Sequence, residues 1–311
     1  MNSPISFLGM PGLPPDLSTH GYELDSLTYW IHVLMAFLFV GWGAFFLYTL
    51  VRFRKGRNPK ASYEGVKSHV SSYLELAVAV VEVVLLFGLA IPLWADRVNV
   101  DFLFRDPATL EVTEDVFEVR VVAQTFAWNV HYPGKDRKFG RTNNKRVNEE
   151  NFIGLVRKKD DPNVADDLVT QDMLVIQVGR PVLVHLSSFD VIHSFFLPNM
   201  RVKHDAIPGM VFPRWFEALK TSSEAKREIY DEKLAAGDAK IVEAQAKYES
   251  DLAAGAADLV HPSQNPEVIR DFEIACAQLC GSGHFDMRGT FKVVTQEEFD
   301  AWLEKELTGD Y

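Results

Sequence analysis

An apolar run from Leu27 to Val51 dominates the first part of the chain, and few folds can accommodate it. It reads LTYWIHVLMAFLFVGWGAFFLYTLV and carries no formal charge unless His32 is protonated. A helix of this length spans roughly 37 Å, which is enough to cross a hydrocarbon layer of about 30 Å. A buried helix of a large soluble protein is the alternative, but an uninterrupted run of this length favours lipid.

A second apolar run, from about Tyr73 to Trp94, predicts a second membrane span. It contains two carboxylates, Glu75 near one end and Glu82 near the middle. Carboxylates inside a span are costly and usually face protein or water. They indicate either pairing with a neighbouring helix or a proton route. In both cases a larger membrane partner is expected to cover this span.

The basic residues of the N-terminal part predict its orientation. All six lie in the short segment between the two spans: Arg52, Arg54, Lys55, Arg57, Lys60 and Lys67. The positive-inside rule places this segment in the cytoplasm, so both termini and the rest of the chain face outward. The first 26 residues have no Lys or Arg and do not resemble a cleaved signal peptide. We therefore expect a membrane hairpin over residues 1–95 and an outer domain over 96–311.

The acidic charge belongs to the outer domain. Residues 1–95 hold six acids and six bases, so the net charge of −11 comes from residues 96–311. This balance argues against nucleic acid as a partner, because its binders need basic patches. The negative charge of the outer domain suits a basic protein partner, although a contribution to solubility alone would also explain this charge. The candidate steering residues are Asp160, Asp161, Asp166, Asp167 and Asp205.

The outer domain has the pattern of an all-β fold. Apolar residues alternate with polar ones over 112–122, and further strands are expected at 172–178, 182–187, 271–275 and 289–294. Many short strands with turns between them predict a sandwich or barrel. The polar segment 135–171 is expected to be a long surface loop.

A helical insertion over about 221–265 interrupts the β pattern. It is rich in Ala, Glu and Lys, begins with a capping box at Thr221 and Glu224, and contains Gly237 as a break between two helices. A solvated helical hairpin and a docking arm for a partner subunit are both consistent with it. A second capping box, at Thr295 and Glu298, predicts a C-terminal helix.

The two cysteines of the chain lie in one short motif, Cys276-Ala-Gln-Leu-Cys280-Gly-Ser-Gly-His284-Phe-Asp-Met287. Two cysteines exclude a multi-disulfide scaffold, a four-cysteine zinc site and a cysteine-ligated iron–sulfur cluster, and no haem c attachment motif is present. Two thiolates, an imidazole and a thioether are the ligand set that favours copper. Two thiolates can bridge two copper ions, and His193 is the best candidate for a second imidazole. A disulfide, a zinc site and unliganded cysteines remain as alternatives.

The motif C-A-Q-L-C-G-S-G-H-F-D-M, together with D-V-I-H-S-F-F-L-P upstream and a two-span hairpin, resembles subunit II of the haem-copper cytochrome c oxidases. The resemblance covers nearly the whole chain except the insertion. It implies a cupredoxin-like β domain with a dinuclear CuA centre. The implied side-chain ligands are His193, Cys276, Cys280, His284 and Met287, and Gln278 takes the position whose backbone carbonyl completes the set.

The resemblance also implies a function. Such a subunit accepts electrons from cytochrome c, or from a haem c domain of a neighbouring complex, and passes them to the oxygen-reducing, proton-pumping subunit I. It would lie in a bacterial-type inner membrane, with the copper domain on the periplasmic side and no haem of its own. A non-redox scaffold, as in quinol oxidases, would lack the copper ligands. A membrane-bound copper carrier would not need polar spans or the aromatic residues near position 126.

Three positions bear on further features of the family. Many members have Glu where this chain has Gln278, and that Glu helps to bind magnesium at the subunit I interface. The family residue that receives the electron is usually Trp, but Phe126 stands at its position and Trp128 follows two residues later. Glu75 aligns with a family Glu at the mouth of a proton channel.

Overall fold

The computed structural model describes residues 13–60, 63–65, 68–106, 112–113, 115–148, 150–156, 159–256 and 259–308. The described residues form two compact units, one of 22–97 and one of 13–21 with 98–308. Lys67 and the first twelve residues, which entered the predictions above, lie outside the described residues. Each unit is considered by itself.

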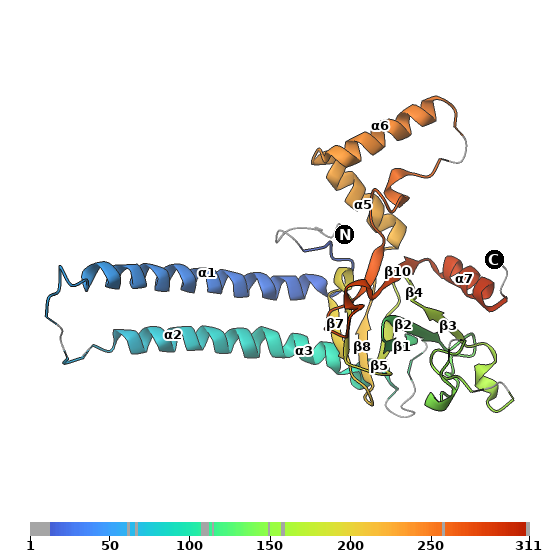
Figure 1. Cartoon of the computed structure of the whole chain (residues 1–311), viewed down its shortest axis with the longest axis horizontal. Helices are drawn as coiled ribbons and strands as arrows, with labels where there is room; N and C mark the ends of the chain where they lie inside the picture. The colour runs from blue at the N-terminus through green and yellow to red at the C-terminus, as the bar shows by residue number, and fades with distance from the viewer. Residues whose placement is uncertain are drawn as a thin grey trace. The chain divides into compact units, whose positions relative to one another are not determined.

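The first unit is a pair of long apolar helices running in opposite directions (Figure 1). They are α1 (Gly21–Arg52) and a continuous helix made of α2 (Val70–Leu85), the π-helical turn η1 (Leu86–Ala90) and α3 (Ile91–Val98). Both are long and apolar enough to cross a membrane, with mean hydropathies of 2.0 and 2.6. None of either apolar window is buried in the chain, so these are not the core helices of a soluble domain. Glu75 and Glu82 both lie exposed on α2.

The second unit is a β-sandwich of two five-stranded sheets. One sheet has the order β3-β2-β1-β5-β8 and the other the order β4-β10-β9-β6-β7. The first comprises β1 (Phe117–Gln124), β2 (Ala127–Tyr132), β3 (Leu168–Gln171), β5 (Val182–Ser188) and β8 (Phe212–Phe216). The second comprises β4 (Met173–Gln177), β6 (His193–Leu197), β7 (Val202–Ala206), β9 (Phe272–Cys276) and β10 (Arg288–Val294).

All five predicted strands are present, and the alternation in β1 is confirmed. Val119, Val121 and Ala123 are fully buried between the sheets, while Glu118 and Arg120 lie on the other face. The prediction of a loop throughout 135–171 was wrong at its end, where β3 pairs with β2. β3 has only four residues and follows a polar segment, so periodicity did not reveal it.

The remaining helices are short or lie at the rim of the sandwich. They are α4 (Val100–Phe104), α5 (Ser222–Ala235), α6 (Ala239–Ala253), α7 (Gln296–Thr308) and the 3-10 turns η2 (Asn144–Arg146), η3 (Pro162–Ala165), η4 (Pro198–Met200), η5 (Pro262–Gln264) and η6 (His284–Asp286). Both predicted capping boxes form, at Thr221 and Glu224 before α5 and at Thr295 and Glu298 before α7.

The inserted helices α5 and α6 are separated at Gly237, whose φ of 74° favours glycine. The first of them is not a solvated arm. Ala225 belongs to the core of the sandwich, and the buried Lys226 forms an ion pair with Asp271, just before β9. The hydroxyl of Ser222 also accepts a hydrogen bond from Val293 N on β10. α5 is therefore part of the framework of the sandwich, while α6 has Ile241 as its only buried residue.

Most of the aspartates suggested for steering a basic partner serve the fold instead. The Asp167 side chain is buried against His131, and Asp161 is buried against Arg141 N. Asp166 accepts hydrogen bonds from two backbone amides of the segment after β2. Asp205 is exposed on β7, and Asp160 pairs with Arg146 on the surface. Two of the five thus remain accessible to a partner.

Candidate metal centre

The cysteine motif lies at one end of the second sheet. β9 ends at Cys276 and β10 begins at Arg288, so the residues between them form a single connecting loop. β6 begins at His193 and runs antiparallel to β9, with Phe195 opposite Cys276. The ends of two neighbouring strands therefore bring His193 to the cysteine loop, although 82 residues lie between His193 and Cys276 in the chain.

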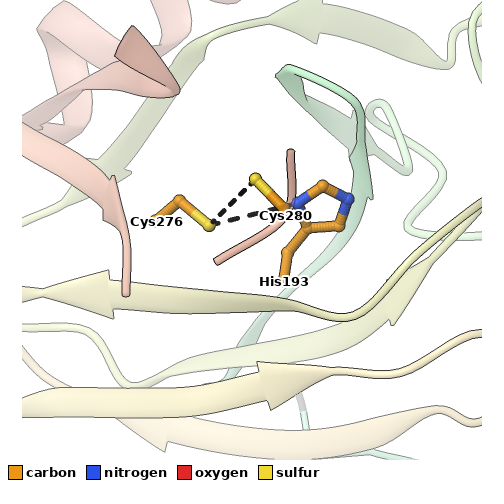
Figure 2. Close-up of side chains that lie close together, drawn as sticks. All are labelled: His193, Cys276 and Cys280. Carbon is orange, nitrogen blue, oxygen red and sulfur yellow. Dashed lines mark hydrogen bonds between the residues drawn. The ribbon is translucent and has the colours of Figure 1, made fainter. Parts of the chain in front are cut away.

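The soft side chains of this loop converge. Cys276 Sγ lies 3.8 Å from Cys280 Sγ and 4.0 Å from His193 Nδ1, as Figure 2 shows. The ligand atoms of these three residues all lie within 4.8 Å of one another. His193 is fully buried, Cys280 is 8% exposed and Cys276 is half-buried.

The other candidate ligands divide between the two sulfurs. Cys280 Sγ lies 3.6 Å from His284 Nδ1 and 3.7 Å from Met287 Sδ. Cys276 Sγ lies 3.2 Å from the backbone carbonyl oxygen of Gln278. All six predicted positions are thus gathered around the pair of sulfurs.

This donor set fits copper better than its alternatives. The cysteines are free thiols, and 3.8 Å is far beyond the length of an S–S bond, about 2.05 Å. Zinc prefers thiolate and imidazole ligands and makes little use of a thioether, whereas Met287 Sδ is buried next to Cys280. Two thiolates, two imidazoles and a thioether form a soft site of the kind that holds copper. Two other histidines of the outer domain, His185 and His204, contact Glu118 and Arg214 instead.

Burial of Cys280 bears on how a metal could enter. Its burial, together with the nearby Cys276, raises the pKa of the Cys280 thiol to about 11. Without a metal this thiol is therefore protonated at neutral pH. A metal that binds here has to displace the proton, since the thiolate is the ligand.

Asp190 is a functional residue that was missed at the sequence level. Its carboxylate lies 3.0 Å from His193 Nε2 and accepts hydrogen bonds from Thr125 N and Val191 N. Burial alone would raise the pKa of Asp190, but hydrogen bonds from these three partners outweigh it and lower the pKa to about 2. The ionised carboxylate therefore accepts the Nε2 proton of His193, which leaves Nδ1 bare and facing the sulfurs. The spacing D-x-x-H is the signal that could have revealed it.

The two aromatic candidates occupy different places. Trp128 is fully buried in β2 and packs edge-on against His193, with ring centroids 6.3 Å apart. Phe126 is half-buried and lies over the cysteine loop. A Cβ added to Gly283 would come within 2.6 Å of the Phe126 ring, so this close approach requires glycine. Phe126 therefore packs against the cysteine loop, and Trp128 packs against His193 within the core.

The loop also presents apolar side chains to solvent next to the sulfurs. Leu279 is 80% exposed and Phe285 is 78% exposed, and each precedes or follows a candidate ligand directly. Exposed large apolar side chains next to a functional site are typical of a contact surface for a partner.

Comparison with known proteins supports the family suggested by the motif. Residues 120–223 match the family model described as cytochrome c oxidase subunit II, periplasmic domain. The alternative cytochrome c oxidase subunit 2 of Bradyrhizobium diazoefficiens is 28% identical over 298 residues, covering 94% of this chain and 83% of that protein. Cytochrome c oxidase subunit 2 of Cereibacter sphaeroides is 24% identical over 319 residues, covering 97% and 82%.

Among solved structures, the periplasmic domain of subunit II of cytochrome oxidase (CoxB) of Bradyrhizobium japonicum is 21% identical to the chain. The similarity covers 63% of this chain and 96% of that one, with a TM-score of 0.34. This score is low, so the assignment rests on the sequence matches.

Proposed function

The chain belongs to the cytochrome c oxidase subunit II family, and on that premise we propose that its outer domain holds a dinuclear copper centre that accepts electrons for the oxidase. The observation that carries this proposal is that the Cys276 and Cys280 sulfurs lie 3.8 Å apart and that the other four candidate ligands surround them. The proposed ligands are His193, Cys276, the Gln278 carbonyl, Cys280, His284 and Met287. When bound, the two copper ions would supply a one-electron carrier.

The protein's own contribution is to hold these ligands still. Cys276 and His193 stand at the ends of hydrogen-bonded strands, and Asp190 fixes the ring of His193. Trp128 fills the core behind that ring, and Phe126 packs on the loop that carries the other ligands. A rigid ligand set supports electron transfer, because a site that moves little between oxidation states reorganises little.

The donor is proposed to approach the cysteine loop. Leu279 and Phe285 offer it an exposed apolar contact beside the ligands, and the acidic balance of the outer domain suits a basic cytochrome c or haem c domain. Subunit I is the proposed electron acceptor, where oxygen reduction is coupled to proton translocation. Retention of the copper ligands argues against a non-redox scaffold, and the polar membrane span argues against a copper carrier.

The proposed topology follows the positive-inside rule. The basic segment between α1 and α2 would face the cytoplasm, and both termini and the copper domain would face the periplasm. Glu75 on α2 would then lie near the cytoplasmic side, where a proton route into subunit I could begin. The exposed Gln278 side chain is neutral, so any magnesium at the subunit I interface would lose one carboxylate ligand.

The copper content tests the proposal. We expect the purified full-length chain, loaded with copper in detergent, to bind two copper ions and to show a purple colour. Electron paramagnetic resonance is expected to show one unpaired electron shared by both ions. One copper per chain, or none, would contradict a dinuclear centre.

Asp190→Asn tests the positioning of His193. The amide is similar in size but bears no charge, so it holds the Nε2 proton of His193 less strongly. We expect copper affinity to fall about 10- to 100-fold, as for other partners of metal ligands, and the reduction potential to shift. Asp205→Asn removes the same charge from an exposed position of β7 and serves as the control. Equal copper affinity in the two variants would show that Asp190 does not position His193.

A further inference from the structure

The outer face of the first sheet contains a cavity of about 650 Å³ that the proposed copper site does not use. This volume is in the range of sites for small organic molecules, about 300–1,000 Å³. Its floor is a row of side chains across three strands, because Arg120 on β1 stands opposite both His131 on β2 and His185 on β5. Its cover is formed by residues between β2 and β3, among them Phe139 and Ile153.

Arg120 lies beside two carboxylates, Asp167 and Glu118, which act on it electrostatically without forming an ion pair with it. Its guanidinium lies on the ring of Phe139, 4.0 Å from the centroid, and donates one long hydrogen bond of 3.5 Å to the Gly140 carbonyl. Arg120 forms no ion pair with any residue that the structure describes. A guanidinium carries five N–H donors in one plane. Stacking on Phe139 covers one of its faces and leaves its edge available for a ligand.

The two carboxylates near Arg120 are already held by histidines. Asp167 lies 2.7 Å from His131 Nε2, and both side chains are completely buried. Glu118 lies 2.6 Å from His185 Nε2. Burial lowers the pKa of His131, and the hydrogen bond to Asp167 acts against this effect. The Nδ1 of His131 is buried and has no hydrogen-bond partner among the described residues, so it is available to a water.

The rest of the cavity lining mixes polar and apolar side chains. The polar ones are Arg105, Thr142, Asn144, Ser187 and Ser188. Phe189, Met210 and Val211 are 38%, 49% and 64% exposed, and all three line the same cavity as Arg120. Val122 and Ile153 add further apolar surface. The cavity therefore combines the guanidinium of Arg120 with an apolar wall, which matches a molecule that has one anionic end and an apolar body. Arg105 adds a second positive charge to the lining.

We propose that this cavity binds a small organic carboxylate, whose carboxylate meets the edge of the Arg120 guanidinium and whose body lies against Phe189, Met210 and Val211. The planar fork of arginine matches a carboxylate with two parallel hydrogen bonds. Inorganic phosphate could meet Arg120 but would leave the apolar wall uncovered, and an amine would be repelled. The site is separate from the proposed copper centre and does not depend on it.

Equilibrium dialysis of the full-length chain with radiolabelled benzoate tests this site. Benzoate has one carboxylate and an apolar ring, and it partitions little into detergent. We expect saturable binding of one benzoate per chain, with or without copper. Arg120→Gln should lower the affinity about tenfold or more, since a hydrogen-bonded charge is lost. Arg146→Gln removes a charge from the same covering segment, where Arg146 pairs with Asp160 on the surface, and should leave binding unchanged.

A second variant tests the same site while leaving Arg120 in place, in case Arg120→Gln fails to fold. Val211→Glu adds a repelling carboxylate at an exposed position of the apolar wall, and it should weaken benzoate binding several-fold without unfolding the chain. Unsaturable benzoate uptake, or equal affinity in Arg120→Gln and Arg146→Gln, would overturn the site. Phosphate binding as tight as benzoate binding would overturn the assignment to an organic carboxylate, and so would binding of benzylamine.

Discussion

Cys280→Ser is expected to abolish electron transfer from cytochrome c to the oxidase while the complex still assembles. Cys280 is the residue on which His284 Nδ1, Met287 Sδ and Cys276 Sγ all converge, within 3.6 to 3.8 Å. A serine hydroxyl would not replace the Cys280 thiolate as a ligand, because a hard oxygen donor binds copper poorly beside soft ligands. The rate of cytochrome c oxidation should fall by about 100-fold or more, since losing even an indirect partner of a metal ligand costs 10- to 100-fold.

Leu279→Ser is the matched control for this variant. Leu279 precedes Cys280 in the same loop, but its side chain is 80% exposed and carries no ligand atom. Copper content and the optical spectrum should be unchanged in Leu279→Ser, while the KM for cytochrome c rises because an apolar contact is lost. If Cys280→Ser oxidised cytochrome c at the normal rate, the loop would not be the point where electrons enter.

The candidate metal site could be proposed from the sequence largely because it is local. Four of its side chains and the Gln278 carbonyl lie within one loop, so their chemistry is readable from twelve consecutive residues. His193 was the best candidate for the second imidazole, but only the pairing of β6 with β9 shows that it reaches the loop. Asp190 was missed for a related reason. Its role depends on the direction of the His193 ring, which is set in three dimensions.

Two of the strands that escaped prediction, β6 and β8, lack a clear alternation. They read HSFFL and FPRWF, and three of the five residues of β6 are bulky and apolar. Apolar residues on both faces are expected where one face meets the core and the other meets a loop or helix. The packing of α5 was missed because its composition is polar, and its buried residues are only the small Ala225, the paired Lys226 and Tyr230.

The positions of Phe126 and Trp128 show what sequence spacing alone could not decide. Residues two apart in a strand share a face, so spacing alone would place both rings on the same face. β2 begins only at Ala127, however, so Phe126 lies in the preceding turn and leaves the face that Trp128 occupies. One ring therefore contacts the surface of the cysteine loop, and the other fills the core.

Trp128→Ala is consequently expected to act on stability before it acts on electron transfer. The Trp128 side chain is completely buried against Phe195 and His193, with ring centroids 5.5 and 6.3 Å away. Truncating a buried tryptophan to alanine leaves a cavity and costs about 3–5 kcal/mol of unfolding free energy. Denaturant unfolding of the copper-free chain, followed by the circular dichroism of the β-domain, measures this loss.

Trp128→Phe separates packing from electron transfer. Phenylalanine keeps an aromatic ring against His193 and Phe195, and it removes an indole Nε1 that has no hydrogen-bond partner among the described residues. We expect most of the stability to return and cytochrome c oxidation to stay within about twofold of the unsubstituted rate, a difference below 0.5 kcal/mol in activation free energy. A drop of tenfold or more with intact copper would instead make the buried indole part of the electron route.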